Sequence, residues 1–478
     1  MKFNSFAFLA IFLPVVAGGY AILRHIMGAR VAQGFLLVLS LSFYGYTKPV
    51  YVLLLLGSIL FNWMIAASIG VAKRDASSSQ MASRKLKLQL GIIGNVLLLC
   101  SFKYVNFFLD HIPSIHGMKL ALPDWSFPIG ISFFTLTQVM YLVDTYQGLN
   151  APNSLFDHAT LVSFFPYVTS GPLVRSRAIV PQFKNLTAST DRMDLACRGL
   201  MLFAFGLAKK VVLADSFARV ADAGFGSAQH FSTLEAWIFS LSYTFQIYFD
   251  FSGYSDMAVG TAWMLGIDIP KNFNAPYISK SISEFWQRWH ISLSNFITNY
   301  LFTPMLRAMG KATLTTSVIA VLLAMSIAGL WHGPAWTFVI FGVLHGLALA
   351  ANQISKKKKL KMPDWLGWVL TFAFVNMTFV FFRSPTVPLA LHMLHAMVPH
   401  AGLLGTKELK GVLPMTPVLI IRPVVIGIVL AFFFKTSQAV AEESAWNYRT
   451  VAVTAVLLGL SIFYMNSSPA KEFVYFAF

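Results

Sequence analysis

His332 is the residue whose surroundings point most directly to chemistry. It lies in the segment Leu330-Trp331-His332-Gly333-Pro334, between residues 315–329 and 337–354, which carry no formal charge. Proline lacks an amide hydrogen and disfavours helix at the residue before it, so we expect an apolar helix to end at Gly333-Pro334. Broken backbone at membrane depth lies against protein or a water-filled cavity. An imidazole there is a candidate functional group and could act as a general base.

His290 is the second candidate, within residues 281–300. Apolar residues recur there at helical spacing, which predicts one continuous amphipathic helix with Arg288 on its polar side. His290 then lies about 80° around the helix from Ile282, at the border of the apolar face. Taken alone, this position is typical of a packed histidine with one hydrogen bond. Trp289 beside it fits a membrane-interface belt equally well.

Residues 246–256 place two carboxylates in a largely apolar stretch. Asp250 and Asp256 are six positions apart, so they do not share a helix face, and a paired acid–base role is weakly indicated. We expect a helix to end at Ser252-Gly253, with nearby polar groups bonding its exposed backbone. A structural polar network is the preferred interpretation. The alternative is that Gln246, Asp250 and Ser252 line a substrate channel.

A kinked apolar segment, residues 159–174, leads to Arg175 and Arg177. Pro166 and Pro172 interrupt it, which predicts a re-entrant or broken element instead of a clean span. The two guanidinium groups could bind a phosphate or pyrophosphate group. Ordinary positive charge at the cytoplasmic face explains them equally well.

The sequence predicts no metal site and no tightly bound cofactor. His332 and His345 are thirteen positions apart, on different faces of any continuous helix, and no third ligand follows at a zinc-like spacing. Phosphate-loop, dinucleotide and nucleophile-elbow motifs are not recognisable. Cys100 and Cys197 form neither a metal-binding nor a disulfide pattern.

The composition is that of a helical membrane protein with several spans. Of 478 residues, 56% are hydrophobic and 12% are charged, against about 25% charged in soluble domains. The net charge of +17 comes from basic residues that cluster between apolar runs, as expected for cytoplasmic loops facing anionic lipid. This distribution argues against nucleic acid as a partner. We interpret the N-terminal apolar run as the first span and not as a signal peptide.

Apolar runs predict about ten to twelve membrane helices with re-entrant or interfacial pieces, without an internal repeat or a soluble domain. The expected spans are residues 7–23, 31–46, 51–72, 89–109, 127–143, 195–214, 236–251, 315–330, 337–354, 365–382, 412–434 and 451–465. Lys311 and the lysine run 356–359 bias the outer ends of the central pair to the cytoplasm. His332 then lies deep in the membrane or across it from that face.

Taken in order, these stretches resemble the membrane-bound O-acyltransferase superfamily, and within it the bacterial branch that serves polysaccharide O-acetylation. The likeness is carried by Trp331-His332-Gly333, Arg288-Trp289-His290 and residues 128–134, 141–144, 164–166, 171–175, 246–256, 273–277, 381–383 and 473–476. It implies an all-α bundle around a central tunnel, forming a single domain over residues 1–478 with its core at about 125–385. Gln287 and Asn299 depart from the arginine and aspartate that are common in the family.

The resemblance also implies roles for individual residues. The family's Trp-His-Gly histidine is taken as catalytic, which implies His332, and the Arg-Trp-His histidine, which matches His290, is taken as functionally necessary. The residues then expected to line the tunnel are Trp331, Trp336, Trp289, Arg288, Asn274, Gln246, Asp250 and Ser252. Trp331 and Trp336 would shape and dry the site. We expect Asn274, Ser292 or Asn295 to orient His290 or an oxyanion.

The implied reaction moves an acetyl group from a cytoplasmic thioester, acetyl-CoA, to an extracytoplasmic polysaccharide. The implied location is the inner membrane of a bacterium, in contact with membrane lipid. The implied partner is a periplasmic acetyltransferase of the SGNH-hydrolase type. Alginate, cellulose and peptidoglycan are all open as acceptors, and D-alanyl transfer to teichoic acid is a weaker option.

Two other classes of protein fit the same residues. A transporter or channel for an acyl carrier or a glycan would also have broken helices and intramembrane histidines, although the absence of a repeat counts against it. A scaffold of a polysaccharide secretion complex would tolerate the loss of both histidines.

Overall fold

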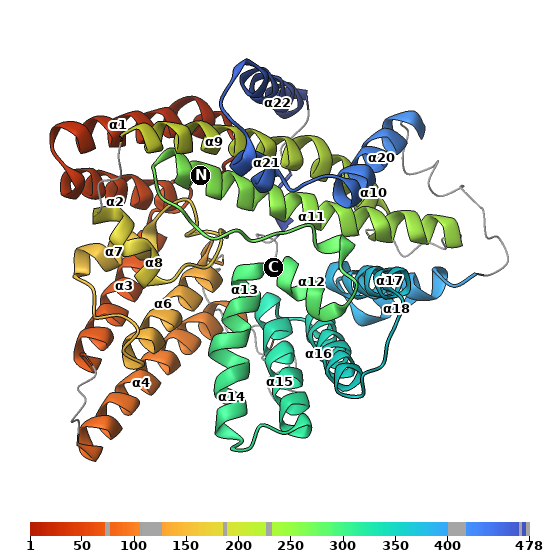
Figure 1. The fold of residues 1–478 in the computed structure, drawn as a ribbon, viewed down its shortest axis with the longest axis horizontal. Coiled ribbons are helices and arrows are strands. Elements are labelled where there is room, and N and C mark those ends of the chain that lie inside the picture. The colour runs from red at the N-terminus through yellow and green to blue at the C-terminus, as the bar shows by residue number, and fades with distance from the viewer. Residues whose placement is uncertain are drawn as a thin grey trace, which may run out of the picture. The chain divides into compact units, whose positions relative to one another are not determined.

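The computed structural model describes residues 1–71, 77–105, 107, 127–184, 189–225, 232–399, 417–467 and 471–474. The polar stretch 111–124, the start of the expected span 412–434 and residues 475–476 of the terminal motif lie outside these ranges. All regular elements in the described ranges are helices, which confirms the expected all-α class (Figure 1).

The chain divides into two compact units, and the prediction of a single domain over residues 1–478 stays a prediction. The first unit comprises Met1–Phe203, Met257–Pro270 and Ala445–Thr450, and the second comprises Ala204–Asp256, Lys271–Ser444 and Val451–Phe478. Three helices have residues in both units: α9 (Ser189–Ala208), α11 (Thr233–Met264) and α22 (Tyr448–Ser467).

The first unit is built on aromatic packing among its N-terminal helices. The helices that lie wholly in it are η1 (Phe8–Phe12), α1 (Leu13–Ile26), α2 (Ala29–Gly45), α3 (Val50–Ile69), α4 (Ser78–Lys103), α6 (Ile131–Tyr146), α7 (Leu155–Ser163) and α8 (Ser176–Lys184). Phe165, just after α7, packs its ring 5.1 Å from Phe12 and 5.4 Å from Phe43. The kinked segment after α7 is therefore part of the buried core, as its apolar sequence requires.

The second unit carries both candidate histidines. The helices that lie wholly in it are η2 (Lys209–Ala214), α10 (Asp215–Phe225), η3 (Pro276–Ile278), α12 (Ile282–Arg288), α13 (Ile291–Phe296), η4 (Ile297–Phe302), α14 (Thr303–Ala308), α15 (Leu314–His332), α16 (Trp336–Lys357), α17 (Asp364–Arg383), α18 (Val387–Ala396), α20 (Pro417–Phe433) and α21 (Ser437–Glu443). Figure 1 shows α15 and α16 side by side, joined by a short turn.

The close approach of α15 and α16 depends on two glycines that face each other. A Cβ atom on Gly329 would lie 2.4 Å from the carbonyl oxygen of Phe338, and one on Gly342 would lie 2.4 Å from that of Met325. Small residues let membrane helices pack backbone to backbone in this way. The glycines therefore fix the helical hairpin whose turn follows His332.

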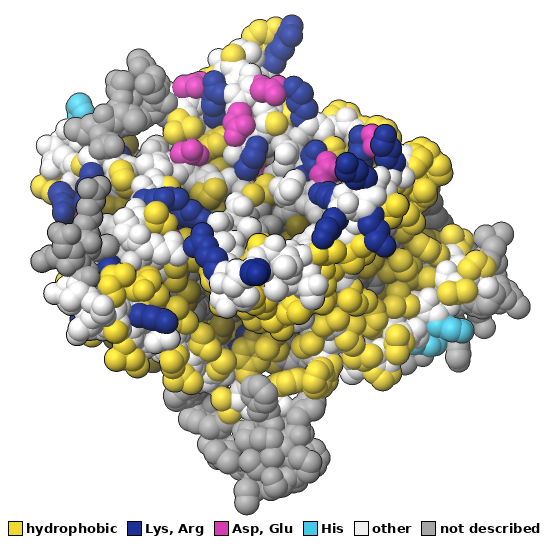
Figure 2. Space-filling view, turned by 60° about the horizontal axis from the view of Figure 1, so that its bottom comes forward, with side chains coloured by type: hydrophobic (Ala, Val, Ile, Leu, Met, Phe, Trp, Pro, Cys, Tyr) yellow, Lys and Arg dark blue, Asp and Glu magenta, His cyan; other side chains and the backbone are white. Residues whose placement is uncertain are grey.

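Seven helices in the described part of the chain are long and apolar enough to cross a membrane. They are Phe8–Ile26, Val50–Ile69, Ser78–Lys103, Leu314–His332, Trp336–Lys357, Asp364–Arg383 and Tyr448–Ser467, and the bent pair Val425–Phe433 with Ser437–Glu443 makes an eighth candidate. Expected spans 31–46, 127–143, 195–214 and 236–251 are helical but do not meet that test. Figure 2 shows apolar side chains gathered over much of one face of the molecule, with lysine and arginine side chains beside them.

Helix α11 runs without a break through Ser252-Gly253, so the expectation of a helix end there is wrong. A Cβ atom on Gly253 would lie 2.7 Å from the carbonyl oxygen of Gly206. The glycine therefore serves the close packing of α11 against α9, and it does not terminate the helix.

Candidate functional site

His290 lies at a break between two helices, which corrects the expectation of one helix over residues 281–300. Helix α12 ends at Arg288 and α13 begins at Ile291. Between them His290 adopts a left-handed backbone conformation, with φ 43° and ψ 54°. A non-glycine residue in this region is strained, and such strain gathers at functional sites. The side chain is 1% exposed, and its ring meets the Phe251 ring edge-on at 4.6 Å.

The break is held by Asn272, a residue that the sequence did not single out. Its main-chain oxygen accepts the amide hydrogen of Ile291 over 2.9 Å. Its side-chain Oδ1 lies 3.1 Å from Nδ1 of His290, and it accepts from the backbone N–H of Ser292 over 3.1 Å and from the Ser292 hydroxyl over 2.9 Å. These bonds replace the intrahelical partners that the start of α13 lacks.

Nδ1 of His290 is therefore hydrogen-bonded to Oδ1 of Asn272, and the Ser292 hydroxyl donates to the same oxygen. Asn274, which was expected to orient His290, instead pairs with Arg288. Its backbone N–H donates to the Arg288 carbonyl over 2.9 Å, and its own carbonyl accepts from Nη1 of Arg288 over 3.1 Å. The only sequence signal for Asn272 was that it is an amide side chain two positions from Asn274.

His332 is the last residue of α15, as the sequence predicted. Gly333 follows in an extended conformation with φ −166° and ψ 156°, and α16 begins at Trp336. His332 is 6% exposed, and its ring centroid lies 5.1 Å from that of Phe382 and 6.1 Å from that of Phe341. The imidazole is thus surrounded by aromatic rings, which exclude bulk water.

Aromatic contacts on α17 connect the surroundings of the two histidines. The ring of Trp289, next to His290, lies 5.3 Å from that of Phe379. Phe379 lies 6.3 Å from Phe382, which packs against His332. The aromatic cluster Trp289–Phe379–Phe382 therefore packs against the His332 ring at one end and includes, at the other, the residue next to His290 in the chain.

His345 has a different environment, in which both ring nitrogens are hydrogen-bonded. Nδ1 accepts the indole hydrogen of Trp286 over 3.2 Å. Since an indole nitrogen only donates, Nδ1 carries no hydrogen, and Nε2 donates to Oγ1 of Thr378 over 3.0 Å. The lone pair that could take a proton is occupied, so His345 is suited to joining α12, α16 and α17 and not to base chemistry.

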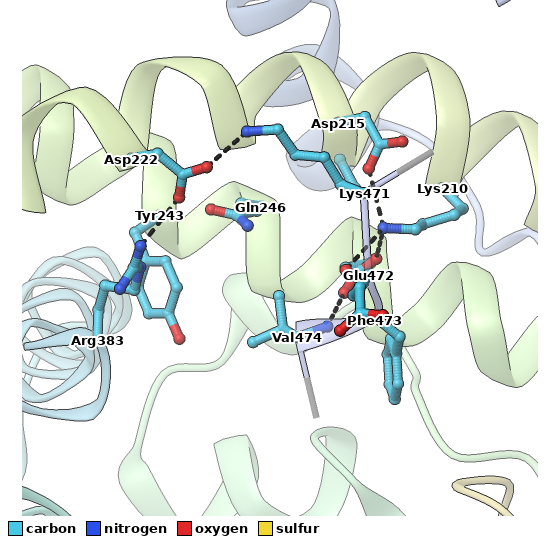
Figure 3. Close-up of a pocket in the computed structure, with 12 residues that line it drawn as sticks. Lys210, Asp215, Asp222, Tyr243, Gln246, Arg383, Lys471, Glu472, Phe473 and Val474 are labelled. Carbon is cyan, nitrogen blue, oxygen red and sulfur yellow. Dashed lines mark hydrogen bonds and ion pairs between the residues drawn. The ribbon is translucent and has the colours of Figure 1, made fainter. Parts of the chain in front are cut away.

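A pocket of about 280 Å³, lined largely by charged and polar residues, lies in the second unit (Figure 3). Its lining residues are Lys210, Ala214, Asp215, Asp222, Tyr243, Gln246, Asp250, Arg383, Lys471, Glu472, Phe473 and Val474. Gln246 and Asp250, two of the predicted channel residues, are among them. The ring of Tyr243 meets that of Phe379 at 6.5 Å, which places the pocket next to the aromatic cluster.

The pocket is closed on one side by residues 471–474. The backbone N–H of Val474 donates to Oδ2 of Asp250 over 2.7 Å, and Lys471 and Arg383 both pair with Asp222 (Figure 3). Burial favours the neutral acid at Asp222, but the two cations outweigh it and hold the pKa of Asp222 below its usual value. These ion pairs thus link Lys471 to α10 and α10 to α17.

The remaining predicted lining residues differ in exposure. Trp289 and Ser252 are 3% and 1% exposed, and Trp331 is 9% exposed with its ring 5.0 Å from that of His332. Arg288 donates to Glu284 on its own helix over 2.9 Å. Trp336 is 56% exposed at the start of α16, and its expected role in drying the site stays a prediction.

Arg175 and Arg177 lie at the start of α8, in the first unit. Arg177 is exposed and Arg175 is half-buried. The anion-binding role stays a prediction.

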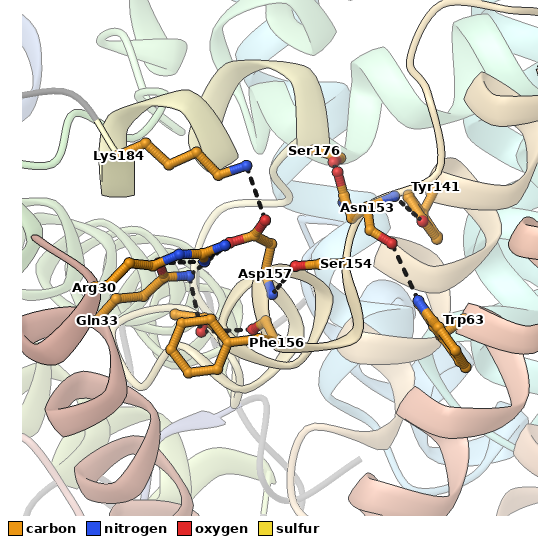
Figure 4. Close-up of polar contacts among 11 residues, drawn as sticks. Arg30, Gln33, Trp63, Tyr141, Asn153, Ser154, Phe156, Asp157, Ser176 and Lys184 are labelled. Atoms are coloured by element: carbon orange, nitrogen blue, oxygen red, sulfur yellow. Dashed lines mark hydrogen bonds and ion pairs between the residues drawn. The ribbon is translucent and has the colours of Figure 1, made fainter.

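Lys184, at the end of α8, takes part in a group of ion pairs around Asp157 (Figure 4). Asp157 pairs with Arg30 over 2.7 Å and with Lys184 over 2.8 Å. Burial favours the neutral acid, but hydrogen bonds from Lys184, Gln33 and Ser154 outweigh it and lower the pKa of Asp157 to about 2. These cations therefore already have an anionic partner.

Comparison with known proteins identifies the class of this chain. The sequence model of the membrane-bound O-acyltransferase family matches residues 88–386, which include both candidate histidines. A peptidoglycan O-acetyltransferase of Helicobacter pylori is 36% identical over 100% of this chain and 98% of its own length. A probable alginate O-acetylase, AlgI, of Pseudomonas aeruginosa is 38% identical over 83% of this chain and 75% of its own.

A teichoic acid D-alanyltransferase of Bacillus subtilis is also similar, at 31% identity over 54% of this chain and 68% of its own length. These relatives act on different acceptors, but all three are named as enzymes that transfer an acyl group or, for AlgI, as a probable one. Together with the several apolar helices, the family match shows a multi-pass membrane enzyme. The chain belongs to the membrane-bound O-acyltransferase family.

Proposed function

We propose that this chain is an O-acetyltransferase that serves acetylation of a polysaccharide outside the cytoplasm, with peptidoglycan as the acceptor class. The observation that carries this proposal is the similarity to a peptidoglycan O-acetyltransferase over 100% of this chain and 98% of that relative. The similarity to the alginate O-acetylase stops at 83% of this chain. Similarity along the whole sequence favours the same acceptor class as well as the same reaction.

The proposed reaction is acetyl transfer from the thioester acetyl-CoA to a hydroxyl group. His332 removes the hydroxyl proton as the oxygen attacks the thioester carbonyl, and a tetrahedral intermediate forms. Its collapse breaks the carbon–sulfur bond, and coenzyme A leaves as the thiol after taking up a proton. The aromatic rings around His332 support this role, because a site closed to bulk water protects the thioester from hydrolysis.

The proposed place of this reaction is a bacterial inner membrane. The lysine run 356–359 at the end of α16 biases that end to the cytoplasm, where the donor is found. His332 lies at the turn between α15 and α16, at the other end of this helical pair from the lysine run, and therefore lies toward the outer face. A periplasmic acetyltransferase of the SGNH-hydrolase type is the proposed partner that completes transfer to the polymer.

The test is thiol release from acetyl-CoA by the purified full-length protein, with and without the candidate partner, for wild type and His332→Ala. We expect release that depends on His332. His25→Ala is the matched control, because His25 is exposed at the end of α1. No release by any form, with or without the partner, would favour the transporter hypothesis.

The acceptor is tested separately in a strain that lacks its own copy of the gene. Mass spectrometry of muropeptides should show O-acetyl groups on complementation with wild type and none with His332→Ala. Unmodified muropeptides together with an acetylated exopolysaccharide would reject peptidoglycan as the acceptor and leave the acetyl-transfer reaction intact.

A further inference from the structure

The orientation of the Asn272 side chain is fixed by a backbone group. Its Oδ1 position lies 3.1 Å from the backbone nitrogen of Ser292. A backbone N–H can only donate, so the atom that faces it must be the amide oxygen and not the amide nitrogen. The other end of the amide, Nδ2, donates to Oγ of Ser255 over 3.4 Å, which agrees with this orientation.

The same oxygen determines which nitrogen of His290 carries hydrogen. Nδ1 of His290 lies 3.1 Å from Oδ1 of Asn272, and because an amide oxygen only accepts, Nδ1 must carry the hydrogen. A neutral imidazole has one N–H, so Nε2 then bears the lone pair. His345 is in the opposite tautomer, with its lone pair on Nδ1 occupied by Trp286.

We propose that Asn272 is a positioning residue for acetyl transfer: it holds His290 in the Nδ1-protonated tautomer, so that Nε2 accepts an N–H or O–H of a substrate. The proposal rests on the proposed function, and it excludes His290 from the oxyanion role, because Nε2 then has no hydrogen to donate to a developing negative charge.

Three further contacts make this arrangement rigid. The carbonyl of Asn272 accepts the backbone N–H of Ile291, and Oδ1 accepts the hydroxyl of Ser292, so the residues after His290 are tied to the same asparagine. The Phe251 ring holds the imidazole edge-on. Asn272 itself is 2% exposed, so water does not compete for its amide. Separately, burial lowers the pKa of His290 to about 3, which keeps the ring neutral at physiological pH.

The tautomer can be read directly, without any activity. In full-length protein labelled with ¹⁵N-histidine, nitrogen resonances of His290 are assigned by difference against His290→Gln. The two ring nitrogens are distinguished by their couplings to the ring protons. We expect the Nδ1 resonance in the range of a protonated imidazole nitrogen and the Nε2 resonance in the range of an unprotonated one. A protonated Nε2 in wild type would overturn the proposal. Since this readout needs no substrate, it stands even if the proposed function fails.

Two variants of nearly equal size test the consequence for catalysis. Asn272→Asp keeps an oxygen that can accept from Nδ1, whereas Asn272→Leu keeps the volume and loses the acceptor. We expect Asn272→Leu to lower kcat about 100-fold, the usual range for a misplaced acid–base group, with KM changed less than about threefold. Asn272→Asp should retain kcat within about tenfold of wild type, a rescue by the remaining acceptor.

Ser255→Ala is the control for the weaker bond on the nitrogen side of the amide, and it should behave as wild type. A purely structural role for Asn272 predicts another pattern: kcat per folded molecule in Asn272→Leu would equal that of wild type, and activity would fall only in proportion to the loss of folded protein. That pattern would overturn the proposal.

Discussion

Trp286 donates its indole hydrogen to Nδ1 of His345 over 3.2 Å, between α12 and α16. This one contact distinguishes His345 from His290 and His332, because it occupies the lone pair that a general base would use. Nε2 of His345 donates to the hydroxyl of Thr378, which in turn donates to the Val375 carbonyl. His345 is therefore a structural link among three helices.

Replacing Trp286 with phenylalanine should cost stability and spare activity. The change leaves the buried Nδ1 of His345 without its donor, which destabilises a protein by about 1–3 kcal/mol. We expect a lower unfolding temperature in detergent and a thiol-release rate within about threefold of wild type. An inactive Trp286→Phe protein of normal stability would assign His345 a role in the chemistry.

His332→Ala should lose activity and keep most of its stability, the reverse of the result expected for Trp286→Phe. The imidazole is lost from the end of α15, where it packs among aromatic rings, and without a general base we expect acetyl-CoA-dependent thiol release to fall about 100-fold or more. The unfolding temperature should change less than in Trp286→Phe. The comparison of the two variants in one assay checks both expectations, and equal losses of activity would contradict them.

Asp250 should be important for stability through Lys210 and Val474. Its carboxylate lies 2.7 Å from the Lys210 ammonium group and accepts the Val474 N–H over 2.7 Å, at 1% exposure. Asp250→Ala removes one of the two carboxylates that pair with the buried Lys210 ammonium group, and we expect a loss of about 3–5 kcal/mol. Asp250→Asn keeps an acceptor for Val474 and should lose less. Denaturant unfolding of the purified proteins measures the difference, and equal stability of both variants would argue against this role.

The stability of the protein should fall at acid pH partly through His290. Burial lowers the pKa of His290 to about 3, whereas an exposed histidine has a pKa of about 6.5. Below pH 6.5 the unfolded chain binds a proton at this residue that the folded chain does not, so stability decreases as the pH falls toward 3.

For one such histidine the loss amounts to about 2 kcal/mol between pH 8 and pH 5. His290→Gln removes the group, so its unfolding free energy should depend less on pH over this interval by about that amount. The matched control is His25→Ala, since the His25 side chain is exposed at the end of α1. Parallel curves for wild type and His290→Gln would contradict the prediction.

The sequence by itself determined the class of protein and the candidate histidines. These features depend on local properties of the sequence. The length of an apolar run and the basic residues beside it determine whether a helix spans the membrane. The missing amide hydrogen of Pro334 ends a helix wherever that helix packs. The end of α15 at His332 was therefore predictable, and so were the broken segment after α7 and most of the spans.

Only the tertiary structure decided how His290 is held. Helical periodicity over residues 281–300 predicted one helix, but Ile291 and Ser292 give their backbone hydrogens to Asn272, about twenty positions earlier in the chain. Likewise Lys209 forms an ion pair with Asp256 on α11, and the adjacent Lys210 forms one with Asp250 on the same helix. Trp336 is exposed, which its apolar sequence did not indicate. Such pairings depend on which buried groups meet after the helices pack, and no pattern within a single helix records that.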